Sequence, residues 1–206
     1  AIALIFFNPM LNIFWREVSV LAVEKSPQKV GEIFFKFSII LFSLTALMST
    51  FLAFNAKEIV FAIAGKSFNN AALPFLMMAF YPLTQIYGQM GGCIYFSFEE
   101  IKKYRNLSIV FVLTNLILTY ILIAPSSLII PGLNMSINEY TFKFILMAII
   151  GPEILIYFCK KKYNIHHFYL ILLRIIILIY LLFMNYLLNY LLDSNFTNIF
   201  YLLAFK

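Results

Sequence analysis

Charged residues, histidine and cysteine are all scarce in this chain of 206 residues. Charged residues make up 12% and hydrophobic residues 63%, with a mean hydropathy of +0.93, so little polar surface is left for contact with water. The two histidines, His166 and His167, are adjacent and point about 100° apart on a helix, so they cannot form the i, i+4 pair of a metal site. We interpret them as a solvated pair at a membrane interface. Cys93 and Cys159 match no metal-binding spacing and are expected to be buried apolar residues.

Motifs for nucleotide binding and catalysis are also missing. Gly65-Lys66-Ser67 resembles the end of a Walker A loop, but Val60 stands where the earlier glycine is required and no strand precedes it. We therefore expect neither enzyme activity nor a metal or cofactor. The net charge of +6 is spread in short clusters at the ends of apolar runs, which indicates contact with anionic lipid rather than nucleic acid.

The basic residues fall in alternate loops between the apolar runs. The intervening loops contain only Lys57 and Lys66. Lysine and arginine accumulate in the cytoplasmic loops of membrane proteins, so three loops should face the cytoplasm and the first span should run from outside to inside. These loops, residues 24–36, 99–106 and 160–167, contain Lys25, Lys29, Lys36, Lys102, Lys103, Arg105, Lys160, Lys161 and Lys162.

The apolar runs predict an all-α, polytopic transmembrane bundle of about six to seven spans that covers residues 1–206. A span needs about 20 residues to cross the hydrocarbon, so the uncharged run 68–98 is too long for one straight crossing. Its crossing should start near Pro74. Because the chain opens and closes within apolar runs, we expect it to be a fragment of a larger protein. The spans are predicted at 1–23, 37–56, within 68–98, and at 107–124, 139–159 and 167–192, with a seventh beginning near residue 198.

Polar residues within the spans are the candidate site residues, because an ionisable group in hydrocarbon is costly and commonly faces a cavity. Glu153 follows Gly151-Pro152, where the helix should kink or free a carbonyl, and its carboxylate is a candidate ion or proton site. Gln85 and Gln89 lie on one face of the third span, in a stretch rich in glycine and proline. This pattern is typical of a substrate path and equally of close helix packing.

Of three further polar residues, the first two have two interpretations and the third has one. Asn8 beside Pro9 is either a packing residue or part of a substrate path. Arg16, with Glu17, is either an exposed interfacial pair or part of the path, and Arg174 is expected to extend toward the inner surface. The substrate-path candidates are therefore Asn8, Arg16, Gln85, Gln89 and Glu153.

Several short motifs, taken together and in order, cover residues 1–165. They are Pro9 followed by a basic stretch with Lys29 and Lys36, the outer segment from Lys57-Glu58-Ile59-Val60 through Gly65-Lys66-Ser67-Phe68 to Ala71-Ala72, and Lys102-Lys103-Tyr104-Arg105-Asn106. In these motifs the chain resembles the C-terminal lobe of the polysaccharide and O-antigen flippases, which carry lipid-linked oligosaccharides. These flippases belong to the multidrug/oligosaccharidyl-lipid/polysaccharide exporter superfamily.

The resemblance implies two six-helix lobes around a central cavity, of which the N-terminal lobe lies outside this chain. It implies alternating access without ATP, in which an undecaprenyl-pyrophosphate-linked repeat unit crosses from the inner to the outer leaflet of the bacterial inner membrane. The implied partners are the lipid-linked oligosaccharide, membrane lipids and other polysaccharide-assembly membrane proteins.

Three other functions stay open: a cation-coupled drug exporter of the same superfamily, a membrane-embedded polysaccharide polymerase or acyltransferase, and a scaffold without transport. Polymerases and acyltransferases of this kind generally need a large outer loop with Arg or His. The outer loops predicted here are short, and the loop after the fourth span has neither residue, which argues against an enzyme.

Overall fold

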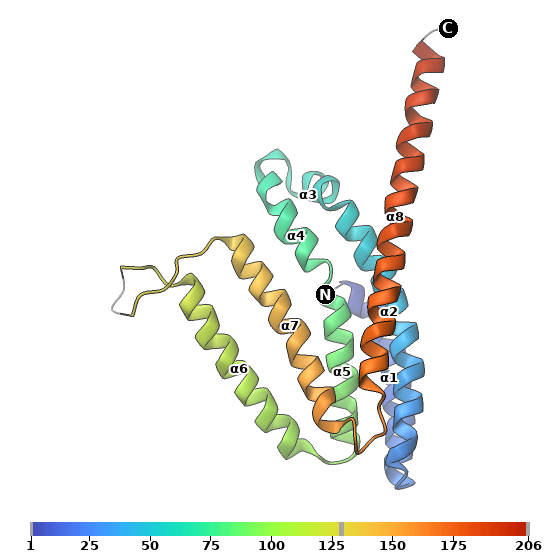
Figure 1. Ribbon diagram of the computed structural model, residues 1–206, viewed down its shortest axis with the longest axis vertical. Helices are drawn as coiled ribbons and strands as arrows, with labels where there is room; N and C mark the ends of the chain where they lie inside the picture. The colour runs from blue at the N-terminus through green and yellow to red at the C-terminus, as the bar shows by residue number, and fades with distance from the viewer. Residues whose placement is uncertain (1, 128–129, 205–206) are drawn as a thin grey trace.

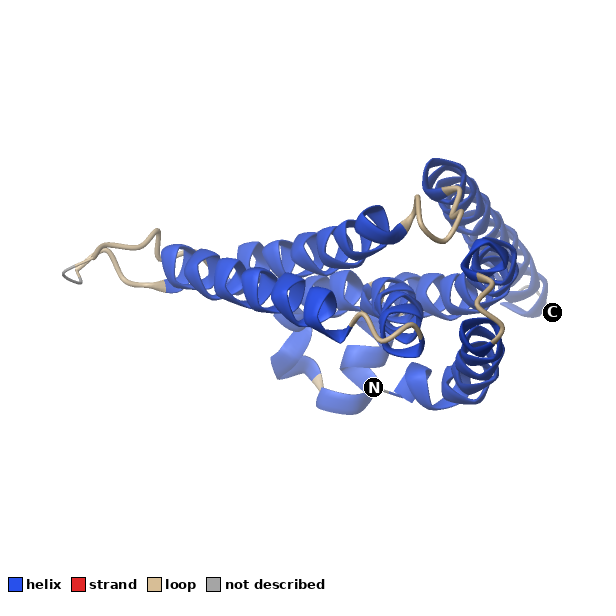
Figure 2. Cartoon of the chain, turned by 90° about the horizontal axis from the view of Figure 1, so that it is seen from below, coloured by secondary structure: helices blue, strands red, loops and turns tan. Residues whose placement is uncertain are grey.

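The computed structural model describes the backbone of residues 2–127 and 130–204 and the side chains of residues 7–127 and 130–187 (Figure 1). All regular structure in this part of the chain is helical, as predicted (Figure 2). Two short 3₁₀ segments, Pro27–Lys29 and Lys66–Ala71, join longer helices. The α helices are α1 (Ile2–Val23), α2 (Val30–Phe54), α3 (Ala56–Ala64), α4 (Ala72–Met78), α5 (Tyr81–Ser97), α6 (Ile101–Ile123), α7 (Ile137–Cys159) and α8 (His167–Ala204).

Within the part of the chain whose side chains the structure describes, four helical segments are long and apolar enough to cross a membrane: Pro27–Phe54, Ile101–Ile123, Ile137–Cys159 and His167–Leu187. They support the prediction of a membrane protein, while the number of crossings stays a prediction. α2 and α6 both begin six or seven residues earlier than predicted. Their first turns contain charged side chains that are exposed at the helix end, so a charge marks the limit of the apolar run without ending the helix.

The third predicted span is interrupted, and proline accounts for the interruption. α4 ends at Met78 and α5 begins at Tyr81, with Pro82 in the first turn of α5. A proline within a continuous helix would lack a donor for the carbonyl of Met78 and would clash with it, so the helix stops and restarts. Pro74 likewise lies in the first turn of α4, where proline is tolerated.

Two sequence predictions about the helices are wrong. The outer segment after the second span, predicted as a loop, contains the nine-residue helix α3. The predicted break between residues 192 and 198 is absent, and α8 runs as one helix of 38 residues. Its length is about 57 Å at 1.5 Å per residue, so it extends well past the other helices (Figure 1).

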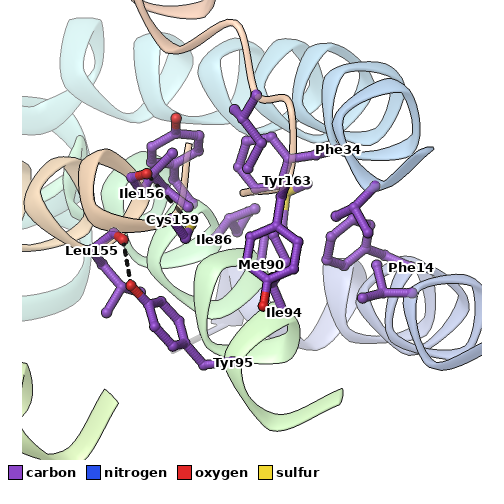
Figure 3. Close-up of a cluster of buried hydrophobic side chains, with 14 of the residues drawn as sticks. Phe14, Phe34, Ile86, Met90, Ile94, Tyr95, Leu155, Ile156, Cys159 and Tyr163 are labelled. Atoms are coloured by element: carbon purple, nitrogen blue, oxygen red, sulfur yellow. Dashed lines mark hydrogen bonds between the residues drawn. The ribbon is translucent and has the colours of Figure 1, made fainter. Parts of the chain in front are cut away.

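Helix α5 lies at the centre of the bundle and packs against α1, α2 and α7. Its glycines allow the close approach of α7: a Cβ on Gly88 would lie 3.2 Å from the ring of Pro152, and one on Gly91 would lie 2.6 Å from Leu155. The hydroxyl of Tyr95 donates a hydrogen bond of 3.0 Å to the carbonyl of Leu155 (Figure 3). The glycines of this span therefore serve helix packing, one of the two roles predicted for them.

The three predicted basic loops lie at one end of the bundle, held together by what we call the Glu100 clamp (Glu100, Lys103, Lys162 and Tyr163). Glu100 forms ion pairs with Lys103, at 3.0 Å, and with Lys162, and it accepts a 3.1 Å hydrogen bond from the hydroxyl of Tyr163. The first basic loop is attached to the third through Gly31 of α2, which lies directly against the backbone of the third loop. We call this end the inner end; that it faces the cytoplasm stays a prediction.

Replacement of Gly31 by alanine should destabilise the fold. The new Cβ would lie 2.1 Å from the carbonyl oxygen of Asn164, so the third loop would have to move. We expect Gly31→Ala to lower the free energy of unfolding by roughly 1–3 kcal/mol, measured by thermal unfolding in detergent. Gly92→Ala is the control, because its Cβ would lie 3.6 Å from the ring of Tyr104, an ordinary contact. An equal loss in both variants would contradict the argument.

The Glu100 clamp should make stability depend on pH. Burial by itself raises the pKa of Glu100, but hydrogen bonds from Lys162, Lys103 and Tyr163 outweigh it, so the pKa lies below its ordinary value. A lowered pKa stabilises the fold above the ordinary carboxyl pKa, and the stabilisation is lost as the pH falls through the pKa of the folded state.

Glu100→Gln should therefore melt at a lower temperature than the wild type at pH 7, and the difference should disappear on acidification. Glu99→Gln, which replaces the exposed neighbouring carboxylate, is the matched control and should change little at either pH. If Glu100→Gln lowers the melting temperature by the same amount at every pH, the variant has lost packing and not the charge interaction.

Candidate functional site

Three ionisable side chains meet between α7 and α8, and we call them the Glu153 bridge. Oε1 of Glu153 lies 2.8 Å from Nη2 of Arg174, and Oε2 lies 2.8 Å from Nε2 of His167. The side chain of Glu153 is 24% exposed, and those of His167 and Arg174 are each 12% exposed. One carboxylate is thus held between two basic groups, largely away from solvent.

The antiparallel arrangement of α7 and α8 explains why these residues meet. Glu153 lies seven residues before Lys160, where α7 has ended, and Arg174 lies seven residues after His167, the first residue of α8. At 1.5 Å per residue both charges lie about 10 Å from the inner end of their helix. His167 and Arg174 are also seven residues apart, which places both on the same face of α8.

Arg174 is held in place by contacts other than the ion pair. Its Nε donates a hydrogen bond of 3.2 Å to the carbonyl of Leu170, one turn earlier in α8. Its Cζ lies 3.9 Å from the centroid of the Tyr87 ring and 6.0 Å from that of Phe42. A desolvated cation over an aromatic face gains about 2 kcal/mol, so Tyr87 stabilises the buried guanidinium directly.

The Glu153 bridge connects two parts of the bundle that have different packing neighbours. α8 packs along α2, whereas α7 packs against α4, α5 and α6. From the inner end, where they are joined, α7 and α8 diverge toward the opposite end of the molecule (Figure 1). The Glu153 bridge therefore joins α7 and α8 where the two helices begin to diverge.

A pocket of about 510 Å³ occupies the space beyond the bridge. Helices α2, α4, α5, α7 and α8 all contribute to its wall, which is almost entirely apolar and includes four aromatic side chains. Tyr87 also has a buried hydroxyl without a hydrogen-bond partner among the described residues. The lining residues are Phe42, Leu76, Met77, Phe80, Leu83, Thr84, Tyr87, Phe142, Ile145, Ile149, Pro152, Glu153, Ile171, Arg174, Ile175 and Leu178.

The Glu153 bridge places charged groups at the wall of an apolar pocket. Charges are screened only weakly at such a place. The guanidinium of Arg174 can therefore receive an anionic group that enters the pocket.

Of the predicted substrate-path residues, only Glu153 lies in this pocket. Asn8 is exposed on α1, and Arg16 pairs with Glu17 at 3.3 Å with side-chain exposures of 75% and 42%. Arg16 thus fits the interfacial-pair interpretation. Gln85 and Gln89 are half-buried on α5 but are not among the residues that line the pocket. The structure brings none of these four residues to the Glu153 bridge.

Two sequence interpretations near the bridge are wrong. His167 is not a solvated interfacial residue, and Arg174 does not extend to the inner surface, because both are directed to the carboxylate of Glu153. The sequence signal that was missed is the helical hairpin formed by α7 and α8. Glu153 and Arg174 lie at equal distances from its short connection, so they lie at the same depth in the bundle. Glu153 was found because it is an isolated carboxylate in an apolar run, whereas its partners were assessed singly.

Comparison with protein-family models, with curated proteins and with solved structures found no match to this chain. The resemblance to the flippases therefore depends on the residues of this sequence alone. Any function has to be argued from the pocket and the bridge.

Removal of the charge of Arg174 alone should lower the free energy of unfolding more than removal of the charges of both Arg174 and Glu153. Arg174→Met leaves Glu153 buried without its main countercharge, which should destabilise the fold by roughly 3–5 kcal/mol. Glu153→Gln together with Arg174→Met removes both charges and should recover most of that loss. Thermal unfolding in detergent measures the cycle, with the exposed Arg16→Met as control. Additive losses in the double variant would show that the two charges do not interact.

Proposed function

We propose that this chain is the C-terminal lobe of a membrane transporter that flips a lipid-linked polysaccharide repeat unit from the inner to the outer leaflet. The observation that carries the proposal is the apolar pocket with ion-paired side chains at its inner end. Such a pocket suits a substrate with a long apolar part joined to a charged group. The resemblance to the flippases narrows that substrate to an undecaprenyl-pyrophosphate-linked unit in the bacterial inner membrane.

The pocket provides distinct partners for the two parts of such a substrate. Its aromatic and aliphatic walls favour the apolar tail. The guanidinium of Arg174 is the natural partner of a pyrophosphate oxygen, since arginine binds phosphate in a planar, bidentate manner. A pyrophosphate that approaches Arg174 competes with the carboxylate of Glu153 for the same donors.

That competition connects substrate binding with movement of the helices. When an anionic head group takes the place of Glu153 at Arg174, the bridge between α7 and α8 is released and the inner end of the pocket opens. Restoration of the ion pair after the head group leaves closes it again. This cycle of opening and closing is the alternating access that the resemblance implies, with the N-terminal lobe as the opposite wall of the cavity.

The helix break between α4 and α5 supports the same function. α4 and α5 both line the pocket, and the break at Ala79–Phe80 lets these two parts of the wall tilt independently. Interrupted helices beside a binding cavity are frequent in secondary transporters. Partners in the membrane would include the enzymes that assemble and polymerise the repeat unit.

The test is a deletion of the gene in the bacterium that carries it, followed by complementation with the complete protein. Loss of surface polysaccharide on a blot, with lipid-linked repeat units accumulating in the inner leaflet, is the expected result. Arg174→Met combined with Glu153→Gln removes the guanidinium without leaving an unpaired carboxylate, so it should reach the membrane and yet fail to restore transport. The exposed Arg16→Gln should restore it. Normal surface polysaccharide after the deletion would overturn the proposal.

A specific observation favours a second candidate, a cation-coupled exporter of amphipathic drugs. A buried carboxylate in a pocket lined by aromatic rings is equally suited to an apolar cation coupled to a proton. The same deletion strain distinguishes the two. Increased sensitivity to cationic drugs with unchanged surface polysaccharide would favour the exporter.

A further inference from the structure

A second buried cation, Lys143, lies on α7 and points to a different kind of site. It is 7% exposed, although it belongs to the outer part of an apolar helix. Its Nζ donates hydrogen bonds to three oxygen atoms of α6: the carbonyl of Asn115, at 3.2 Å, the side-chain oxygen Oδ1 of Asn115, and Oγ1 of Thr119. All three donors of the ammonium are therefore occupied.

All three acceptors are neutral, which is unusual for a lysine buried in an apolar helix. Among the described residues Lys143 forms no ion pair, and the two carboxylates on α7 have other partners. Glu139 accepts a hydrogen bond from Ser136, and Glu153 belongs to the bridge. The positive charge is balanced by oxygen dipoles and by the ring of Tyr140, whose centroid lies 5.7 Å from Nζ.

The three oxygens form a compact set because Asn115 and Thr119 lie one turn apart on α6. The hydroxyl of Thr119 donates a hydrogen bond of 2.7 Å to the carbonyl of Asn115, which leaves its lone pairs free for Nζ. A main-chain carbonyl, an amide oxygen and a hydroxyl converging on one positive charge form the kind of ligand set that holds a hydrated alkali cation in membrane proteins. With its three donors occupied, the ammonium has none left for an anion.

We propose that α6 carries a site for a monovalent cation and that the ammonium of Lys143 occupies it as a tethered cation. The proposal does not depend on transport of any substrate. No side chain of α6 is buried, and among the described residues α6 packs mainly on α7 and α5, so this contact fastens α6 to α7 without any ion from solution. A second pocket of about 500 Å³ is lined in part by Lys143, so the ammonium side chain borders a space that a small ion can enter.

Removal of the ammonium should turn the site into one for a free ion. The experiment compares melting temperatures of the purified protein in choline chloride, NaCl and KCl at equal ionic strength. The wild type should melt at the same temperature in all three salts. Lys143→Ala should melt lower in choline chloride and regain several degrees, saturably, in NaCl or KCl, since a bound ion stabilises the folded state.

The control is Lys143→Ala combined with Thr119→Val, which removes one oxygen at nearly constant side-chain shape. This double variant should lose most of the response to Na⁺ or K⁺. If Lys143→Ala fails to fold in choline chloride, its recovery as monodisperse protein in NaCl or KCl is the supporting result. An Ala variant with no cation-specific response, or a wild type with the same response, would overturn the proposal.

Discussion

The carboxylate of Glu153 joins α7 to α8, two helices that otherwise pack on different neighbours, and this contact forms part of the pocket wall. Buried charges in a bundle of this kind have to find partners within the protein, because hydrocarbon offers none. The same requirement explains the buried hydroxyls of α2, where Thr45 and Thr50 donate to carbonyls one turn earlier in their own helix. A buried ion pair contributes little net stability, so its value here is the fixed relation of α7 to α8.

α7 carries two largely buried charges, Glu153 and Lys143, and each is stabilised in a different way. Toward α8 it presents a carboxylate that meets two basic groups, and toward α6 it presents an ammonium that meets only neutral oxygens. The first contact borders a pocket, so in the proposed function it is the one that an entering anion would exchange. The second is saturated by neutral groups and offers no such exchange. A movable contact on one face and a permanent one on the other would let α6 and α7 travel as a unit.

The long helices were predictable from sequence because uninterrupted apolar runs and charged ends determine them. In the third apolar run the crossing was predicted to start near Pro74, whereas the helix is interrupted before Pro82. The chemistry of proline explains that break but did not select which proline would cause it. α3 was missed because Lys57 and Glu58 lie together near its start and its other seven residues are all apolar, so its nine positions show no helical period. The continuous helix α8 was not predicted, because the polar residues near 193 resemble the end of a membrane span. Glu153 was identified as an isolated carboxylate deep in an apolar run. Lys143 lies only four residues inside the predicted start of the same span, where a lysine is ordinary, so nothing in the sequence singled it out.

The contact of Gly31 with the third loop and the Glu100 clamp fasten the basic loops to one another at the inner end, while α6 and α7 lean away from α8 at the other end (Figures 1 and 2). α7 and α8 thus form a wedge-shaped gap that is narrow at the inner end and wide at the other. α4 packs on both α7 and α2, so it closes one side of this gap and becomes part of the pocket wall. A change in the angle between α7 and α8 would therefore alter the pocket most where α4 lies.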